Sequence, residues 1–189
     1  GATQFMVNGA SANQVVMGLI VDNTRNAAAD VLTQVKVHSR NSAAFSVKRI
    51  AVYREMSCGV PGFGAGNPAT LSTSSDDLAG QQSLPGTFSW GVPEIDWLTT
   101  TIPGEQVTVP IGGGPGTVAG GQIAYYYIVV DLNDVVINAS DVSRNAYTGE
   151  VVGLALNSIA LPATDPTALT FTTAGVGPRV ALNGVEQVV

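Results

Sequence analysis

The sequence predicts an all-β protein, an antiparallel β-sandwich of the immunoglobulin-like or jelly-roll kind with about nine to twelve short strands. Three observations predict it. Apolar residues recur with period two over short stretches, and helical periodicity is nearly absent. The 22 glycines and 10 prolines divide these stretches at the spacing of strand-joining turns. Residues 121–131 are apolar on both faces, as in a strand buried on both sides.

The first third of the chain supplies four predicted strands. Residues 3–7 form a short apolar stretch, and residues 14–21 alternate with apolar side chains on one face. The turn residues 23–26 follow, and a second alternating strand is predicted over 31–38. Residues 45–53 complete the set.

A glycine- and proline-rich stretch interrupts this pattern and predicts a long loop at about residues 54–85. A loop of this length is uncommon in a compact domain and often carries function. Two further short strands are predicted after it, at residues 87–90 and 95–101.

The second half of the chain predicts a β-hairpin. Residues 106–111 alternate, a glycine-rich turn occupies 112–116, and the long apolar strand runs over 122–132. The remaining predicted strands lie at residues 147–161, 168–173, 179–182 and 185–189. Asn183-Gly184 predicts a type I′ turn between the last two of them.

Length and composition indicate one domain over residues 14–189, preceded by an extended segment at residues 1–13. Only 12% of the residues are charged, the net charge is −6, and the lysines are Lys36 and Lys48. Binding to nucleic acid or to an anionic membrane requires clustered basic residues, so neither partner is expected. The chain has no apolar run long enough for membrane insertion as a helix. A weakly charged surface rich in Asn, Thr, Ser and Gln favours an extracellular or cell-surface location.

The sequence does not predict an enzyme. His38 is the only histidine, and it falls on the solvent side of a predicted strand. A catalytic triad would have to use it, and a zinc site with two histidines is excluded by count. The carboxylate pairs Asp76–Asp77 and Glu94/Asp96 are interpreted as solvated loop residues.

Calcium is the one candidate cofactor. Asp131, Asp134 and Asp141 follow the long apolar strand and would offer oxygen ligands in a loop. The alternative is that these residues serve ordinary turn chemistry. Cys58 is the only cysteine, so it is interpreted as a free thiol or, alternatively, as half of a disulfide between chains.

Aromatic residues offer a candidate glycan platform. Trp90 and Trp97 flank a Gly-Val-Pro turn, and Tyr125, Tyr126 and Tyr127 alternate across one strand. For all five aromatic residues, filling of the core is favoured over stacking on a ligand, and at least one face of the tyrosine strand is expected to be buried. A carbohydrate-binding or adhesion module at Trp90 and Trp97 is the alternative function.

The order of the strands resembles that of immunoglobulin-like modules in prokaryotic extracellular and surface proteins. The resemblance is carried by residues 14–21, 30–39 (DVLTQVKVHS), 47–54 (VKRIAVYR), 59–63 (GVPGF), 102–109 (IPGEQVTV) and 125–132 (YYYIVVDL). It implies a β-sandwich fold and an extracellular role. A viral capsid or tail jelly roll fits the same strand count.

A narrower resemblance is to subunits of extracellular fibres of the TasA type and their archaeal counterparts, and it rests on the apolar stretch ATQFMV and the connector Asn8-Gly-Ala-Ser11. It implies a homopolymer in which Thr3, Phe5 and Val7 belong to a donor strand that complements a neighbouring sandwich. The alternative is a first strand that pairs within its own domain. Residues 185–189 are a second candidate donor.

Overall fold

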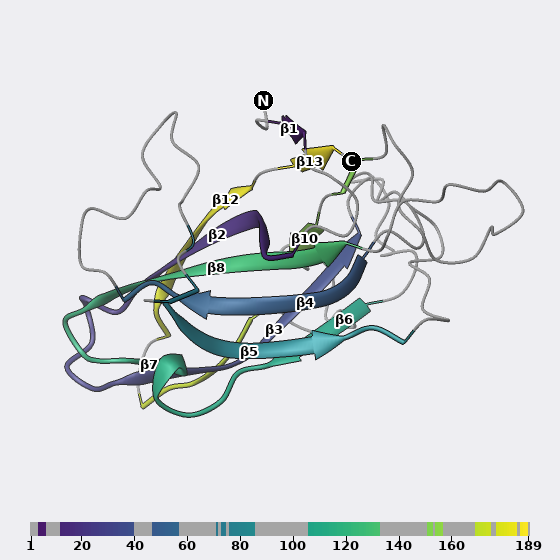
Figure 1. Ribbon diagram of the computed structural model, residues 1–189. Helices are drawn as coiled ribbons and strands as arrows, with labels where there is room; N and C mark the ends of the chain where they lie inside the picture. The colour runs from purple at the N-terminus through teal and green to yellow at the C-terminus, as the bar shows by residue number, and fades with distance from the viewer. Residues whose placement is uncertain are drawn as a thin grey trace, which may run out of the picture.

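Two antiparallel sheets form the protein, and a third, smaller sheet joins the first and last strands of the chain (Figure 1). The computed structural model describes residues 4–6, 12–39, 47–56, 71, 73–74, 76–85, 106–132, 151–152, 154–156, 169–174, 177–184 and 186–188. These residues contain thirteen strands and one short 3₁₀ turn. The predicted all-β sandwich is therefore confirmed, with slightly more strands than expected because several are only two or three residues long.

The first sheet has five strands in the order β12-β2-β8-β4-β5. Their bounds are Arg179–Gly184 for β12, Gln14–Asp22 for β2, Ile123–Leu132 for β8, Val47–Arg54 for β4 and Asp77–Ser83 for β5. Every neighbouring pair is antiparallel. The long apolar strand predicted from the sequence is β8, and it lies at the centre of this sheet.

The second sheet is organised around one strand, β3, which spans Asp30–Ser39. β6 (Gln106–Pro110) and β7 (Thr117–Val118) follow one another along one edge of β3. β10 (Leu154–Leu156) and β11 (Leu169–Thr172) pair with the opposite edge. All four pairings are antiparallel.

The third sheet contains β1 (Gln4–Met6), β13 (Glu186–Val188) and β9 (Val151–Val152). β13 is its central strand, antiparallel to β9 and parallel to β1. This parallel pair departs from the antiparallel rule that holds in the two larger sheets. Figure 1 shows β1 and β13 next to the two marked chain ends.

The core lies between the two larger sheets and is built mainly from valine, leucine and isoleucine. Val35 and Val37 of β3 face Leu19 of β2 and Ile128 of β8, and all four side chains are fully buried. A second, smaller apolar cluster covers the outer face of the first sheet and includes Ala51, Tyr53, Tyr127 and Val129. Because β8 is packed on both faces, its sequence is apolar without alternation.

One end of the sandwich is closed by the buried side chain of Asn23. Its Nδ2 donates to the carbonyl oxygens of Ala28 and Val118 at 3.0 and 2.9 Å. Its Oδ1 accepts from Asn26 Nδ2 at 2.6 Å, and the Asn26 amide nitrogen lies 3.2 Å from the Asn23 carbonyl oxygen. The turn predicted at residues 23–26 is confirmed, and its polar groups are satisfied inside the protein.

The predicted hairpin is wrong. β6 pairs with β3 in the second sheet, whereas β8 lies between β2 and β4 in the first. Residues 111–116 connect β6 to β7, and both strands pair antiparallel with the same edge of β3. The glycine-rich segment therefore interrupts the pairing along that edge and does not reverse the direction of the chain. Alternation and a glycine turn are compatible with both arrangements, and only packing across the sandwich separates them.

Two other boundaries also differ from expectation. The loop predicted at residues 54–85 contains β5, which pairs with β4 through a bulge at Val52/Tyr53. The type I′ turn predicted at Asn183-Gly184 is wrong, because both residues continue β12 opposite Gly18 and Met17. Residues 87–90 and 95–101 lie outside the described part of the chain. No helix in the described part is long and apolar enough to cross a membrane.

Candidate functional site

The small third sheet is the first element of the candidate site. β1 pairs with β13 in the register Gln4↔Glu186, Phe5↔Gln187 and Met6↔Val188. β13 is the only strand paired with β1 among the described residues. Gln4–Met6 therefore pairs within its own chain in the isolated molecule, and Thr3 and Val7 lie outside the described residues. Exchange of this strand between copies stays a prediction.

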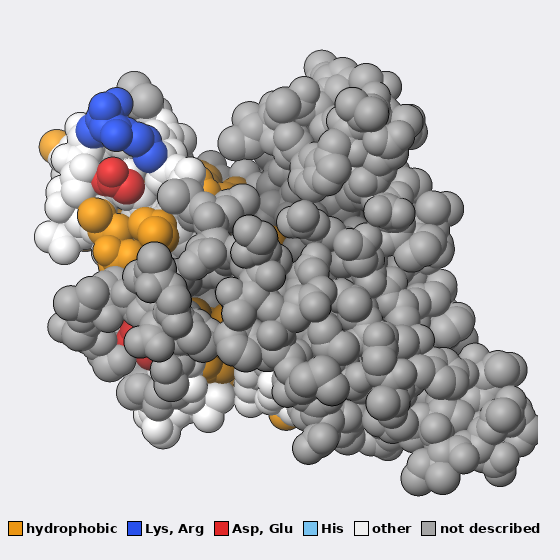
Figure 2. All heavy atoms as spheres, turned by 90° about the horizontal axis from the view of Figure 1, so that it is seen from above, with side chains coloured by type: hydrophobic (Ala, Val, Ile, Leu, Met, Phe, Trp, Pro, Cys, Tyr) orange, Lys and Arg blue, Asp and Glu red, His pale blue; other side chains and the backbone are white. Residues whose placement is uncertain are grey.

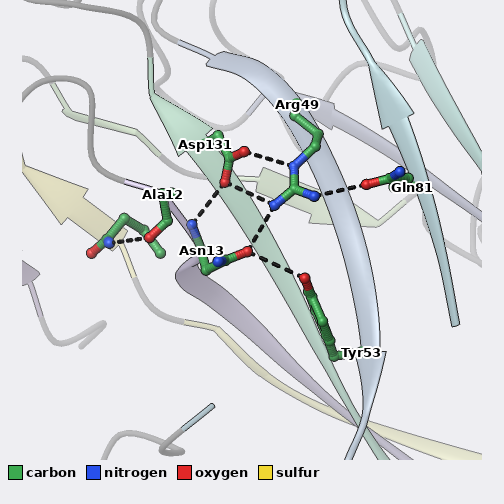
Figure 3. Close-up of polar contacts among 7 residues, drawn as sticks. Ala12, Asn13, Arg49, Tyr53, Gln81 and Asp131 are labelled. Atoms are coloured by element: carbon green, nitrogen blue, oxygen red, sulfur yellow. Dashed lines mark hydrogen bonds and ion pairs between the residues drawn. The ribbon is translucent and has the colours of Figure 1, made fainter. Parts of the chain in front are cut away.

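Asn13 fixes the point where the chain enters the first sheet. It adopts a left-handed backbone conformation, with φ of 54°. Its amide nitrogen donates to Asp131 Oδ1 at 2.7 Å, and its side-chain oxygen accepts from Arg49 Nη2 at 2.7 Å and from the Tyr53 hydroxyl at 3.4 Å (Figure 3). We call Asn13, Arg49, Tyr53 and Asp131 the Asn13 anchor.

Arg49 is the centre of the Asn13 anchor. Its Nε lies 2.6 Å from Asp131 Oδ2 and its Nη2 lies 3.1 Å from Asp131 Oδ1, which is a bidentate ion pair. Its Nη1 donates to Gln81 Oε1 at 2.7 Å. One guanidinium thus joins β4, β5 and β8 to the start of β2 (Figure 3). The hydrogen bond with Asp131 raises the pKa of Arg49.

The Asn13 anchor bears on the calcium hypothesis. Asp131 directs both carboxylate oxygens at a guanidinium, so a Ca²⁺ ion would have to displace a bound positive charge. Asp134 and Asp141 lie outside the described residues. Among the residues that are described, no group of three or more His, Cys, Asp or Glu side chains could hold a metal ion. The geometry assigns Asp131 to an ion pair.

A second polar group lies at the other end of the outer face of the first sheet. The Tyr127 hydroxyl donates to the Glu55 carboxylate, and burial together with this hydrogen bond raises the pKa of Tyr127. Asp76 is buried and accepts from the Met56 amide nitrogen at 3.2 Å, whereas Asp77 is exposed. The interpretation of Asp76 as solvated is therefore wrong, because its side chain is buried and hydrogen-bonded.

Core filling is confirmed for Tyr126 and Tyr127. Tyr126 is fully buried in the main core, Tyr127 is fully buried in the outer cluster, and Tyr125 is half-buried. The Tyr126 hydroxyl donates to the Pro115 carbonyl oxygen at 2.9 Å, and burial raises its pKa to about 12. Trp90 and Trp97, the other two residues of the predicted glycan platform, lie outside the described residues. Cys58 also lies outside them.

Arg54 and the glycine-rich segment form a further contact between the sheets. Arg54 Nη1 donates to the carbonyl oxygens of Thr117 and Pro115, the second at 3.2 Å. The Gly112 amide nitrogen donates to the Ala79 carbonyl oxygen on β5 at 2.9 Å. This segment therefore covers one edge of the sandwich and uses backbone groups of β5 that a neighbouring strand would need.

Part of the outer surface is apolar. Among the described residues Met56, Leu78 and Ile123 are 45%, 44% and 42% exposed. Figure 2 shows hydrophobic side chains gathered beside a basic and an acidic group at the left of the view. Isolated apolar side chains of this kind are normal on a protein surface and define no ligand site by themselves.

Sequence reasoning did not find the Asn13 anchor. Its signals are present but weak, since Arg49 is one of three basic residues in β4 and Asp131 is the one charged residue of the long buried strand β8. Those two residues meet only because β4 and β8 are neighbours in the sheet. Comparisons with models of protein families, with curated proteins and with solved structures find no match to this chain.

Proposed function

We propose that this protein is a non-catalytic structural subunit of an extracellular filament or surface layer, in which neighbouring copies join by β-strand complementation. The observation that carries the proposal is the third sheet. The first and last strands of the chain pair with each other and are not part of the two sheets that enclose the core.

A short strand held in this way suits assembly. β1 has three residues and pairs with three residues of β13, so among the described residues only a short strand pairing retains it within its own chain. The same bonds form when β1 of one copy pairs with β13 of another, and exchange of an identical element is a low-cost route to association. Strand addition also satisfies main-chain groups that would otherwise remain unpaired.

Composition supports the same proposal. Charged residues make up 12% of the chain, about half of the ~25% typical of soluble domains, and the net charge of −6 is modest. Weak electrostatic repulsion between identical copies favours close packing of many subunits. No observation on the described residues favours the alternative, a glycan-binding module at Trp90 and Trp97.

The test is assembly of the purified protein. Light scattering over a range of concentrations, with negative-stain electron microscopy of the same samples, should show filaments or regular sheets that grow with concentration. A variant that lacks residues 1–11 keeps Asn13 and should remain a monomer. If the unaltered 189-residue chain stays at 19.3 kDa at every concentration, the proposal is contradicted.

A further inference from the structure

We infer that β1 is the strand that is exchanged, and that its acceptor is β13 of a second copy, in the same parallel register that the two strands adopt within one chain. This inference rests on the proposed function and specifies it. The pairing within one chain supplies the acceptor strand and the parallel polarity of the contact, and neither follows from assembly alone.

The connections of the two strands decide which of them moves. β13 follows β12 after one residue, and β12 pairs along its six residues with β2 in the first sheet. β13 also pairs with β9 on its second edge. Withdrawing β13 would therefore break contacts on both sides, whereas withdrawing β1 breaks only its pairing with β13 among the described strands.

The β5 edge of the first sheet is a less suitable acceptor for β1 than β13 is. β5 contains a bulge opposite Val52/Tyr53, and its Ala79 carbonyl oxygen already accepts from Gly112. Bulges and covering loops are the devices by which proteins block edge pairing. β12 lacks a second strand partner within the described residues, so it is the competing acceptor that an experiment has to exclude.

The Asn13 anchor sets how far β1 can reach. Arg49 and Asp131 hold Asn13 on the first sheet whether β1 pairs within its chain or with a neighbour. The seven peptide steps from Met6 to Asn13 span at most about 24 Å when extended. The inference therefore requires β13 of the neighbouring copy to lie within that distance of Asn13.

The experiment is a disulfide cross-link between two singly substituted proteins, each carrying Cys58→Ser. One carries Gln4→Cys and the other Glu186→Cys, which are register partners. Paired strands lie about 4.8 Å apart, within the Cα separation that a disulfide can bridge. Mixing the two proteins under assembly conditions with a mild oxidant should give a covalent dimer that contains one of each.

The matched control replaces Glu186→Cys with Arg179→Cys, an exposed position on β12. We expect at least tenfold less dimer from this mixture. A dimer of Gln4→Cys with Arg179→Cys in its place would overturn the inference by assigning β12 as the acceptor. Assemblies that form without either dimer would also overturn it, while leaving the proposed function intact.

A doubly substituted chain gives an independent readout. Gln4→Cys and Glu186→Cys together, oxidised at low concentration, should close a disulfide within the chain and hold β1 on its own β13. This locked protein should remain a monomer and should assemble once a reducing agent is added. Assembly of the locked protein would overturn the inference, and failure of every unlocked protein to assemble would overturn both this inference and the proposed function.

Discussion

Asn13 satisfies two requirements at once, a left-handed backbone and a side-chain acceptor for Arg49 and Tyr53. Asparagine is among the few residues other than glycine that tolerate this backbone conformation. The residue therefore joins the bend before β2 to an ion pair between the neighbouring strands β4 and β8. No pattern in the local sequence reveals this pairing.

Two substitutions separate these requirements. Asn13→Gly keeps the backbone and loses the side-chain hydrogen bonds, so we expect a loss of about 1–2 kcal/mol in the free energy of unfolding. Asn13→Ala loses the same bonds and adds about 1 kcal/mol of backbone strain. Urea unfolding of both variants measures the difference. Equal stability of the two would show that the backbone conformation is not under strain.

The ion pair between Arg49 and Asp131 is partly shielded, with side chains that are 21% and 13% exposed. Asp131→Asn leaves the guanidinium without its counter-charge, and we expect a loss of about 1–2 kcal/mol, less than for a fully buried pair. A double-mutant cycle with Arg49→Met isolates the coupling between the two residues. Additive losses would mean that the two side chains are energetically independent.

Among the elements, the contact between β5 and β6 depends on one missing side chain. A Cβ at Gly80 would overlap the Pro110 carbonyl oxygen, which is backbone and cannot move aside locally. We expect Gly80→Ala to cost about 2–3 kcal/mol in unfolding free energy, as overpacked sites do. Gly112→Ala is the control, because nothing lies within 4 Å of its Cβ position. Similar losses in both variants would refute the steric explanation.

The glycine-rich segment between β6 and β7 is fastened to the first sheet by Arg54 and Tyr126. Burial raises the pKa of Tyr126 from its ordinary value of 10.0 to about 12. Because this pKa is higher in the folded state than in the unfolded state, the protonated Tyr126 hydroxyl contributes stability below pH 10. This contribution is lost as the pH rises towards 12. The protein should therefore lose stability over that interval.

Tyr126→Phe tests this dependence. At pH 8 the variant should be about 1 kcal/mol less stable, because the hydrogen bond to the Pro115 carbonyl oxygen is lost. Between pH 10 and 12 its stability should fall less steeply than that of the wild type, although Tyr127 still titrates. Urea unfolding at a series of pH values gives both slopes. Parallel slopes would show that Tyr126 does not control the alkaline transition.

At the scale of the whole molecule, stability is expected to differ between the sheets. β2, β8 and β4 lie at the centre of the first sheet and carry most of its fully buried side chains, whereas in the described part of the chain β1 pairs with one short strand. Hydrogen exchange should therefore protect amides of β8 up to the global unfolding free energy and those of β1 much less. Equal protection would show that β1 is an integral part of the fold.

Specific residues show how far the sequence could predict the molecule. The alternation over residues 14–21 and 31–38 predicted strands with one apolar face, because period two is a property of a single strand, and Leu19, Val35 and Val37 of these strands are fully buried. Gly80, by contrast, has no local signature, because its role depends on a carbonyl oxygen of another sheet. The sequence left Asp131 open between a calcium ligand and ordinary turn chemistry, because its partner Arg49 is distant in the chain.

The sequence by itself determined that this chain is a β-sandwich, where most of its strands lie, and that the long apolar strand is buried on both faces. Those properties depend on periodicity and local turn chemistry. The tertiary structure alone decided that β6 and β8 belong to different sheets, that Arg49 meets Asp131, and that β1 pairs with β13. Strand partners are set by packing between segments far apart in the chain, and a local pattern carries no record of which segments meet.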